Sequence, residues 1–220
     1  MFVHPVVHVV DVEAAVHEVR KVVRHPIHGV FLIDHDADDQ RLIDTIAAVA
    51  GEFGDLFLGA NFIRRPIEDA LAVLTQHFGD EIPLAAIWAD RVTALAPGSA
   101  APKVALPESW RGLHFGGVAF KYQDPVPLAD LPALGAAARD HVDVATTSGP
   151  GTGHAADLTR LKALHEGLAG HPLGLASGVT VDNIGSYAGL VDHVLVATGI
   201  LGDDRLIDEA KLEALLAAIA

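Results

Sequence analysis

Three short apolar segments in the last third of the chain each end in a turn that contains glycine. They cover residues 142–147, 173–176 and 193–197, and a helical pattern follows each turn. The first N–H groups of a helix have no partner within it, and the helix dipole adds positive charge at the same place. Such turns bind anions, so we expect a phosphate there. The residues expected to bind the phosphate or the rest of the substrate in these turns are Ser148, Gly149, Gly151, Thr152, Ser177, Gly178, Val179, Thr198, Gly199 and Ile200.

A second group of reactive side chains follows the apolar segment 29–33. Asp34 and Asp36 are alternate residues with His35 between them, so along a strand both carboxylates face the same way. Two carboxylates beside a histidine hold a divalent metal ion, or act as a general base with its orienting partner. The alternative is a solvated loop whose later aspartates cap a helix. We name Asp34 and Asp36 as candidate catalytic residues and assign no metal ligand.

Two further candidates stand at the ends of apolar segments. Lys121 follows residues 112–120, where a lysine pairs with phosphate, stabilises an oxyanion or forms a Schiff base. The alternative is a surface lysine with its stem packed on apolar neighbours. His8 ends the first apolar segment and is either an acid–base group or a core histidine. We include Lys121 and His8 among the catalytic candidates.

The elements that must position these residues follow from the hydrophobic pattern. Strand-like apolar segments alternate with helical patterns along the chain, which indicates a parallel sheet covered by helices. Eight such units in 220 residues predict an α/β fold, a single (β/α)8 (TIM) barrel spanning 1–220, with an open doubly wound sheet as the alternative. The expected strands are 3–10, 29–33, 56–60, 84–89, 112–120, 142–147, 173–176 and 193–197, and the expected helices are 12–24, 39–53, 66–78, 128–140, 157–169, 181–191 and 205–218.

In a barrel of this kind the active residues lie at the C-terminal ends of the strands. This rule places Asn61 and Arg64, after the third strand, beside the other candidates, and we expect them to contact substrate. The same rule adds Trp88, Asp90 and Arg91 after the fourth strand, without a specific role. An irregular segment rich in Pro, Ala and Gly, residues 92–109, follows and is expected to be a binding loop or a surface insertion.

The amino-acid composition indicates which kinds of molecule the protein binds and which it does not. The formal net charge of −14 and the absence of a basic stripe argue against nucleic-acid binding. The chain has no cysteine, which excludes disulfides and thiolate chemistry and is compatible with a cytoplasmic protein. No apolar segment approaches the roughly 20 residues that a membrane helix needs, so we expect no membrane insertion. A homo-oligomer is compatible with all of these features.

Several segments resemble one known family. The run Leu-Gly-Ala-Asn-Phe-Ile-Arg-Arg at 58–65 is similar to the Gly-Val-Asn-Val-Leu-Arg-Asn run of the BtpA family. The turn at 147–153, the Ser-Gly-Val-Thr element at 177–184 and Lys121 also have counterparts there. The resemblance implies a barrel of the ribulose-phosphate-binding type and a suspected enzyme of undefined reaction. Asp203 and Asp204 stand where that family often has a basic residue, and they oppose a phosphate dianion.

These observations predict an enzyme that acts on a small phosphorylated metabolite, a sugar phosphate or a nucleotide-like compound. Its phosphate would lie on the loops after strands 6 to 8, and its acid–base residues at the ends of strands 1, 2 and 5. Two alternatives are a metal-dependent hydrolase built on the Asp34–Asp36 cluster and a non-catalytic BtpA-like binding or assembly factor. A flavin enzyme is a further alternative, and the sequence does not identify a cofactor.

Overall fold

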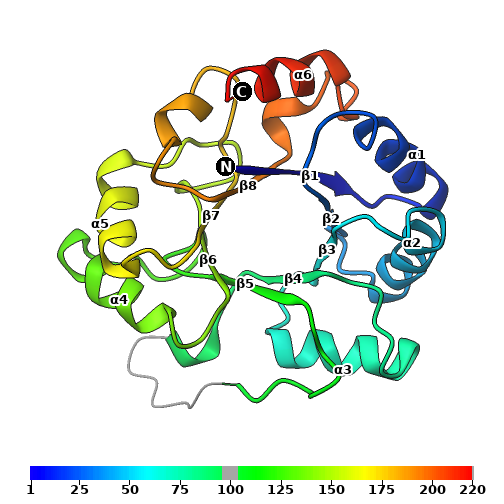
Figure 1. Ribbon diagram of the computed structural model, residues 1–220, viewed down its shortest axis with the longest axis horizontal. Helices are drawn as coiled ribbons and strands as arrows, with labels where there is room; N and C mark the ends of the chain where they lie inside the picture. The colour runs from blue at the N-terminus through cyan, green and yellow to red at the C-terminus, as the bar shows by residue number, and fades with distance from the viewer. Residues whose placement is uncertain (96–103, 220) are drawn as a thin grey trace.

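Eight parallel strands form a closed barrel in sequence order, which confirms the predicted (β/α)8 fold (Figure 1). The computed structural model describes residues 1–95 and 104–219, so residues 96–103 of the predicted insertion at 92–109 lie outside the described part. Phe2 to Pro5 of the first strand pair with His193 to Val196 of the last and close the barrel. The strands are β1 (Phe2–His8), β2 (Val30–Ile33), β3 (Leu58–Asn61), β4 (Ala86–Ala89), β5 (Leu113–Gly117), β6 (Val144–Thr147), β7 (Leu173–Ala176) and β8 (His193–Val196).

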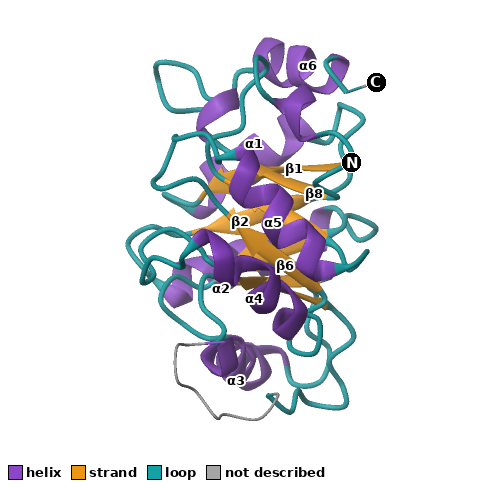
Figure 2. Ribbon diagram, turned by 90° about the vertical axis from the view of Figure 1, so that its left-hand side faces the viewer, coloured by secondary structure: helices purple, strands orange, loops and turns teal. Residues whose placement is uncertain are grey.

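Helices surround the strands, as the side view in Figure 2 shows. Four of them begin at an aspartate whose carboxylate accepts N–H groups of the first turn, at Asp11, Asp38, Asp157 and Asp208. The α-helices are α1 (Val12–Val22), α2 (Asp39–Glu52), α3 (Ile67–Phe78), α4 (Leu131–Ala138), α5 (Leu158–Leu168) and α6 (Glu209–Ala217), and the short 3-10 helices are η1 (Thr93–Leu95), η2 (Leu128–Asp130), η3 (Ile184–Tyr187) and η4 (Thr198–Ile200).

The strands are apolar on both faces because each face has its own core. Inside the barrel, large rings such as Phe31, Trp88 and Phe115 pack against aliphatic side chains. Gly59 leaves room for the Phe31 ring, since a Cβ at this position would overlap it. Between the barrel and the helices lies the larger core, which the buried faces of the helices contribute. Its members include Val19, Ile46, Leu74, Leu164 and Leu212.

Two predicted helices are wrong in extent. Only η3 forms within the predicted helix 181–191, because the Asn183 side chain bonds the preceding turn and Gly189 takes a left-handed φ of 76°. The last helix starts at Glu209 rather than 205. An antiparallel bridge between Leu201 and Ile207 holds the residues before it in an extended turn.

The fifth strand is also shorter than the predicted segment 112–120. It ends at Gly117, and the chain then turns through Ala119, whose φ of 48° cannot continue a strand. The turn brings Phe120 back into the barrel core and sends Lys121 to the C-terminal rim. The short strand therefore decides where this lysine lies.

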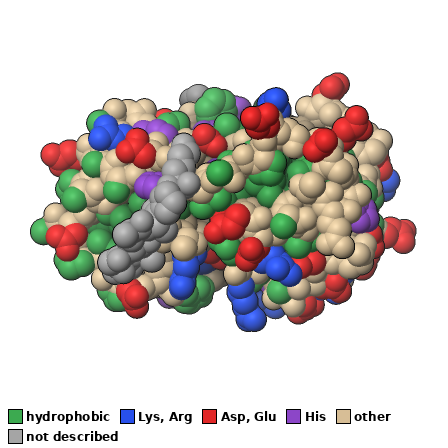
Figure 3. Space-filling model, turned by 90° about the horizontal axis from the view of Figure 1, so that it is seen from below, with side chains coloured by type: hydrophobic (Ala, Val, Ile, Leu, Met, Phe, Trp, Pro, Cys, Tyr) green, Lys and Arg blue, Asp and Glu red, His purple; other side chains and the backbone are tan. Residues whose placement is uncertain are grey.

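The surface carries the charge that the composition predicts. Figure 3 shows acidic side chains dispersed over one face, with Lys and Arg side chains between them. None of the helices in residues 1–95 and 104–219 has the length and apolar character that a membrane span requires.

The N-terminal end of the barrel is closed by a cluster of histidine and phenylalanine rings. His4 Nε2 and His193 Nδ1 share a hydrogen bond of 3.1 Å, and the His4 ring lies edge-on to Phe31. Burial lowers the pKa of His4 to about 3, with a smaller contribution from His193 and His28. Burial also lowers the pKa of His193 to about 4, although the Asp192 carboxylate opposes it. Both histidines are therefore neutral in the folded protein near neutral pH.

We predict that this cluster makes the protein acid-sensitive. The unfolded chain binds protons on these histidines below about pH 6.5, whereas the folded protein does so only near pH 3 to 4. The free energy of unfolding should fall as the pH drops through this window, by up to about 1.4 kcal/mol for each unit of pKa difference. Urea titrations at several pH values measure it.

The variant His4→Phe removes one titrating ring and should flatten this pH dependence. His17→Phe, on the exposed side of α1, is the matched control and should leave it unchanged. An equally steep pH dependence in His4→Phe would contradict the assignment.

Candidate active site

A cavity of about 650 Å³ opens at the C-terminal end of the barrel. Side chains after β2, β4, β5 and β6 line it, among them His35, Asp90, Lys121 and Thr152, and the Trp88 ring forms part of its wall. Because the C-terminal ends of all eight strands meet at one rim, residues more than 110 positions apart in sequence share this space. This cavity is the candidate active site.

Asp90 is the acidic side chain among the described residues that line the cavity. It follows β4, and the buried Asn61 at the end of β3 donates a hydrogen bond of 2.9 Å from Nδ2 to Asp90 Oδ1. Burial raises the pKa of Asp90, although the Asn61 hydrogen bond and the positive charge of Lys121 oppose the shift. A carboxyl group held this way, with its pKa moved toward neutrality, is suited to accept and return a proton.

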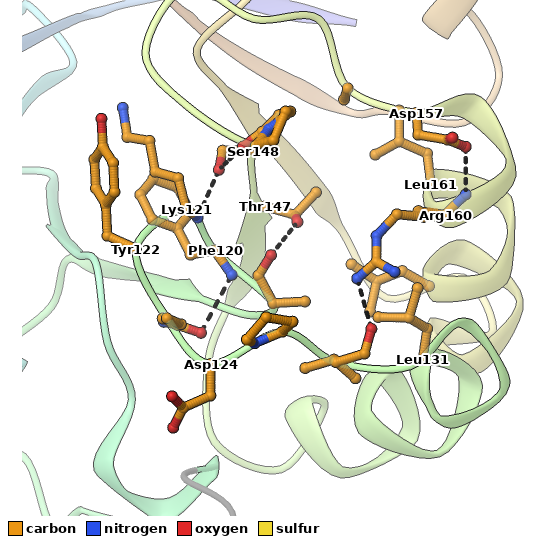
Figure 4. Close-up of a pocket in the computed structure, with 18 residues that line it drawn as sticks. Phe120, Lys121, Tyr122, Asp124, Leu131, Thr147, Ser148, Asp157, Arg160 and Leu161 are labelled. Atoms are coloured by element: carbon orange, nitrogen blue, oxygen red, sulfur yellow. Dashed lines mark hydrogen bonds between the residues drawn. The ribbon is translucent and has the colours of Figure 1, made fainter.

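Lys121 and Tyr122 line the same cavity, and Figure 4 shows their side chains next to each other. Its backbone N–H donates to Ser148 Oγ at 2.8 Å, and its Nζ donates to Thr152 Oγ1 at 3.2 Å. Burial lowers the pKa of Lys121, and the charges of Asp90 and Tyr122 oppose this shift. The lysine therefore faces the cavity with its ammonium fixed by the loop after β6, unlike a surface lysine.

Lys121 and Tyr122 also border a second cavity of about 340 Å³, which Figure 4 shows in close-up. Its far wall is the start of α5, where Arg160 donates to the Val126 carbonyl at 2.9 Å. The loop after β5 is thereby tied to α5 behind the lysine. This tie supports the position of Lys121 from the side opposite to the active-site cavity.

His8 and His35 form a pair at the ends of β1 and β2. Their rings are edge-to-face with centroids 4.7 Å apart. Burial lowers the pKa of His8 to about 4, and electrostatic interactions with His35, Arg205 and Lys121 lower it further. Burial also lowers the pKa of His35. Both rings are neutral near pH 7, so each has a nitrogen lone pair that accepts hydrogen bonds or protons.

Asp34 and Asp36 are held by Arg41 of α2. Arg41 donates from Nε and Nη2 to the two oxygens of Asp34 at 2.6 and 2.8 Å, and from Nη2 to Asp36 at 2.9 Å. The Asp36 N–H also donates to Asp34 Oδ1. Burial raises the pKa of Asp34, but these hydrogen bonds outweigh it and leave the pKa below its ordinary value. The geometry favours a role for this pair in fixing the loop that carries His35.

A metal site at Asp34 and Asp36, the alternative interpretation of this cluster, finds no support among the described residues. Within the residues that the structure describes, no three His, Asp or Glu side chains gather in a way that would hold a metal ion. Both Asp34 oxygens accept hydrogen bonds from Arg41, and the exposed Asp36 shares the same guanidinium.

The loops after β6, β7 and β8 pack directly on one another. Ser177 Oγ accepts the Gly153 N–H at 3.1 Å and donates to the Gly151 carbonyl at 3.2 Å. Gly178 lies against the backbone of His154, where a Cβ would collide with the carbonyl. The predicted turn residues therefore come together, with Thr198 beside Gly153, Gly199 against the Val179 carbonyl, and Gly149 against the His154 carbonyl.

Asn183 fixes the turn after β7. Its side chain accepts the Thr180 N–H and donates to the Gly178 carbonyl, both at 2.8 Å. Within the described residues, the N–H groups of Gly178 and Val179 have no acceptor. The Ile200 N–H donates to the Ala197 carbonyl, and the Ile200 side chain is buried in the core. The phosphate contact predicted for Ile200 is therefore left to the other residues of η4. Free N–H groups in a braced turn are what an anion needs.

The structure adds residues that the sequence interpretation left out. Asn183 and Arg41 act through side-chain contacts whose partners no sequence pattern identifies. Arg205 follows the acidic pair at 203–204 and lies near enough to His8 to lower its pKa, so a basic residue does follow β8. Asp204 accepts the Leu206 N–H at 3.0 Å within its own turn. Arg64 is exposed on the wall of the cavity.

Comparisons with known proteins establish the fold. No protein-family model matches the chain, and no curated protein gives a significant match. Phosphoribosyl anthranilate isomerase from Thermus thermophilus is similar with 14% identity and a TM-score of 0.65, over 100% of this chain and 98% of that one. A structure described as native KDPGal has 12% identity and a TM-score of 0.67, over 99% and 94%.

A third similar structure is tryptophan synthase subunit alpha from Legionella pneumophila str. Paris. It has 12% identity and a TM-score of 0.58, and the match covers 99% of this chain and 92% of that one. At these identities the likeness shows the barrel fold alone. The resemblance to the BtpA family stays a prediction.

The two aspartates of the Arg41 cluster are predicted to differ in their effect on stability. Asp34→Asn loses charge-assisted hydrogen bonds at a buried position and should lower the free energy of unfolding by about 2 kcal/mol. Asp36→Asn, whose side chain is 82% exposed, should change it little. Urea denaturation of both variants measures the difference, and equal effects would contradict this description.

Proposed function

We propose that this protein is an enzyme that transfers protons on a small phosphorylated metabolite. The observation that carries the proposal is the convergence of Asp90 and Lys121 on one cavity, with their pKa values shifted in opposite directions by burial. Thr152 lines the same cavity and belongs to the loop that packs on the glycine turns. A substrate with its phosphate on those turns would extend past Thr152 toward both groups.

Backbone N–H groups would hold the phosphate. The donors are those of Gly178, Val179 and Gly199, in a turn and a 3-10 helix that follow β7 and β8. In barrels of this fold, phosphate sites are frequently built from these two loops. Two of the similar structures are named phosphoribosyl anthranilate isomerase, a name that describes a phosphorylated substrate. The BtpA resemblance supports the same class of ligand.

The chemistry that suits the two groups is enolisation beside a carbonyl. The Asp90 carboxylate would take the proton from the carbon next to the carbonyl, and the electron pair would move to the carbonyl oxygen. The Lys121 ammonium would donate a hydrogen bond to that oxygen and neutralise its charge. Returning the proton to a neighbouring carbon gives an isomerisation. His8 and His35, both neutral, would carry protons between oxygens of the substrate.

The remaining predicted residues support these roles. Asn61 would position Asp90 through its amide hydrogen bond. Ser148 would position Lys121 through the backbone. Asp34 and Asp36 would act through Arg41 on the loop that carries His35, rather than in contact with substrate.

Phosphate binding is predicted to appear at named amides. Titration of ¹⁵N-labelled protein with inorganic phosphate should shift the amide signals of Gly178, Val179 and Gly199 with saturation. The amides of Gly54 and Gly79, which follow α2 and α3 at the opposite end of the barrel, should not move. Asn183→Ala loosens the turn and should weaken binding at least five-fold. Shifts that do not saturate, or that occur equally at both ends, would contradict the site.

Proton transfer is predicted to depend on Asp90 and Lys121. Exchange of carbon-bound hydrogen in ribulose 5-phosphate in D₂O, followed by NMR, measures the step directly. Asp90→Asn and Lys121→Met should each lower the rate about 100-fold or more. Asp140→Asn and Lys162→Met, both at exposed positions, are the matched controls and should have no effect.

The pH dependence of the same exchange should reflect the raised pKa of Asp90 and the lowered pKa of Lys121. Activity requires ionised Asp90 and protonated Lys121. Because the pKa of Asp90 is raised, the acid limb should lie above pH 3.8, and because the pKa of Lys121 is lowered, the alkaline limb should lie below pH 10.5. The absence of exchange with any small phosphorylated ketose or phosphorylated keto acid would remove the support for this function.

A further inference from the structure

The active-site cavity is basic although the protein is acidic. The chain has 15 Lys and Arg against 29 Asp and Glu. Among the described residues that line the cavity, four are basic, namely Arg64, Arg65, Arg91 and Lys121, and Asp90 alone is acidic. Basic side chains gathered in one cavity of an acidic protein indicate a binding site for an anion.

Two of these arginines, Arg64 and Arg91, have guanidinium groups that form no bond to another side chain among the described residues. Arg65 forms an ion pair with Asp39 of α2. Within residues 1–95 and 104–219, neither Arg64 nor Arg91 has a carboxylate or hydrogen-bond partner. Arg91 also borders a smaller cavity with Glu68, yet no ion pair joins the two. Arg64 takes a left-handed φ of 68°, an uncommon conformation for a residue other than glycine.

A buried donor lies on the same wall. Trp88, 5% exposed, lines the cavity, and its Nε1 has no acceptor among the described residues. A buried N–H without a partner is costly, and a bound ligand or water commonly supplies the acceptor. This donor is independent of the arginines, and an acceptor group on a ligand in the cavity would satisfy it.

The arginines and the glycine turns lie on different sides of the barrel. Arg64 and Arg91 follow β3 and β4, whereas the turns follow β7 and β8, four strands further round the closed barrel. One phosphate bound at the turns therefore does not account for them. The arginines line the cavity that Lys121 and Asp90 also line, and Thr152, from the loop that packs on the glycine turns, lines it as well.

We infer that the substrate carries a carboxylate at the end opposite its phosphate, and that Arg64 and Arg91 bind this carboxylate. The inference rests on the proposed function and deepens it to one substrate class, the phosphorylated carboxylic acids. Arginine recognises a carboxylate through two parallel hydrogen bonds. The singly charged carboxylate fits better than a second phosphate, because Asp90 lines the same cavity and repels a dianion more strongly.

Calorimetric binding of two matched ligands tests the inference. 3-Phosphoglycerate and glycerol 3-phosphate differ in a carboxylate against a hydroxymethyl group. The wild-type protein should bind 3-phosphoglycerate at least ten-fold more tightly. Arg91→Gln, and Arg64→Gly, which also suits the left-handed backbone, should each reduce the preference to below three-fold while glycerol 3-phosphate binding stays unchanged. Arg139→Gln, an exposed arginine at the end of α4, should keep the preference.

Each outcome decides a different point. Equal binding of the two ligands by the wild-type protein, or a preference that survives in both variants, would overturn the carboxylate subsite and leave the phosphate site standing. Tighter binding of fructose 1,6-bisphosphate than of 3-phosphoglycerate would overturn it in favour of a second phosphate. Binding of none of the three would reject the proposed function itself.

Discussion

Closure of the parallel sheet between β8 and β1 is the constraint on which the rest of the structure depends. Four pairs, from Phe2↔His193 to Pro5↔Val196, join the first strand to the last. A closed sheet has no edge strand, and in a closed parallel sheet every strand ends at the same rim. Asn61 is the last residue of β3, and Asp90 and Lys121 follow β4 and β5. They meet only because these three successive strands are fixed side by side.

Backbone packing at the rim explains the glycines better than ligand approach alone. Gly178 and Gly199 each face a carbonyl of the neighbouring loop, so a side chain at either position would separate the loops. The same packing holds the turn after β7 in a shape that leaves the Gly178 and Val179 N–H groups without an acceptor in the part of the chain that the structure describes. The same glycines are needed for the loops to pack and for the N–H groups to stay free for an anion. A glycine turn in the sequence therefore does not show which of the two roles it has.

The cavity lining is rich in basic side chains, whereas the protein as a whole has a net negative charge. Arg41 engages the carboxylates of Asp34 and Asp36, and this leaves Asp90 as the acid that faces Lys121. Burial raises the pKa of Asp90, which makes it a weaker acid, and lowers the pKa of Lys121, which makes its ammonium a stronger acid. In both cases the charged form loses hydration. The opposite shifts bring both groups closer to the pH range in which proton transfer is fast.

The sequence by itself determined the barrel, because a period of apolar strands and amphipathic helices depends on residues close together in the chain. It also placed Lys121, His8 and the glycine turns at one rim, since topology follows from strand order. Tertiary structure alone decided the rest. The partner of Asp34 lies on α2, and the hydrogen bond that orients Asp90 comes from β3. The predicted helix at 181–191 does not form, because the Asn183 side chain bonds the backbone of the preceding turn. Pairing, burial and the resulting pKa shifts are properties of contacts between distant segments, which no local pattern records.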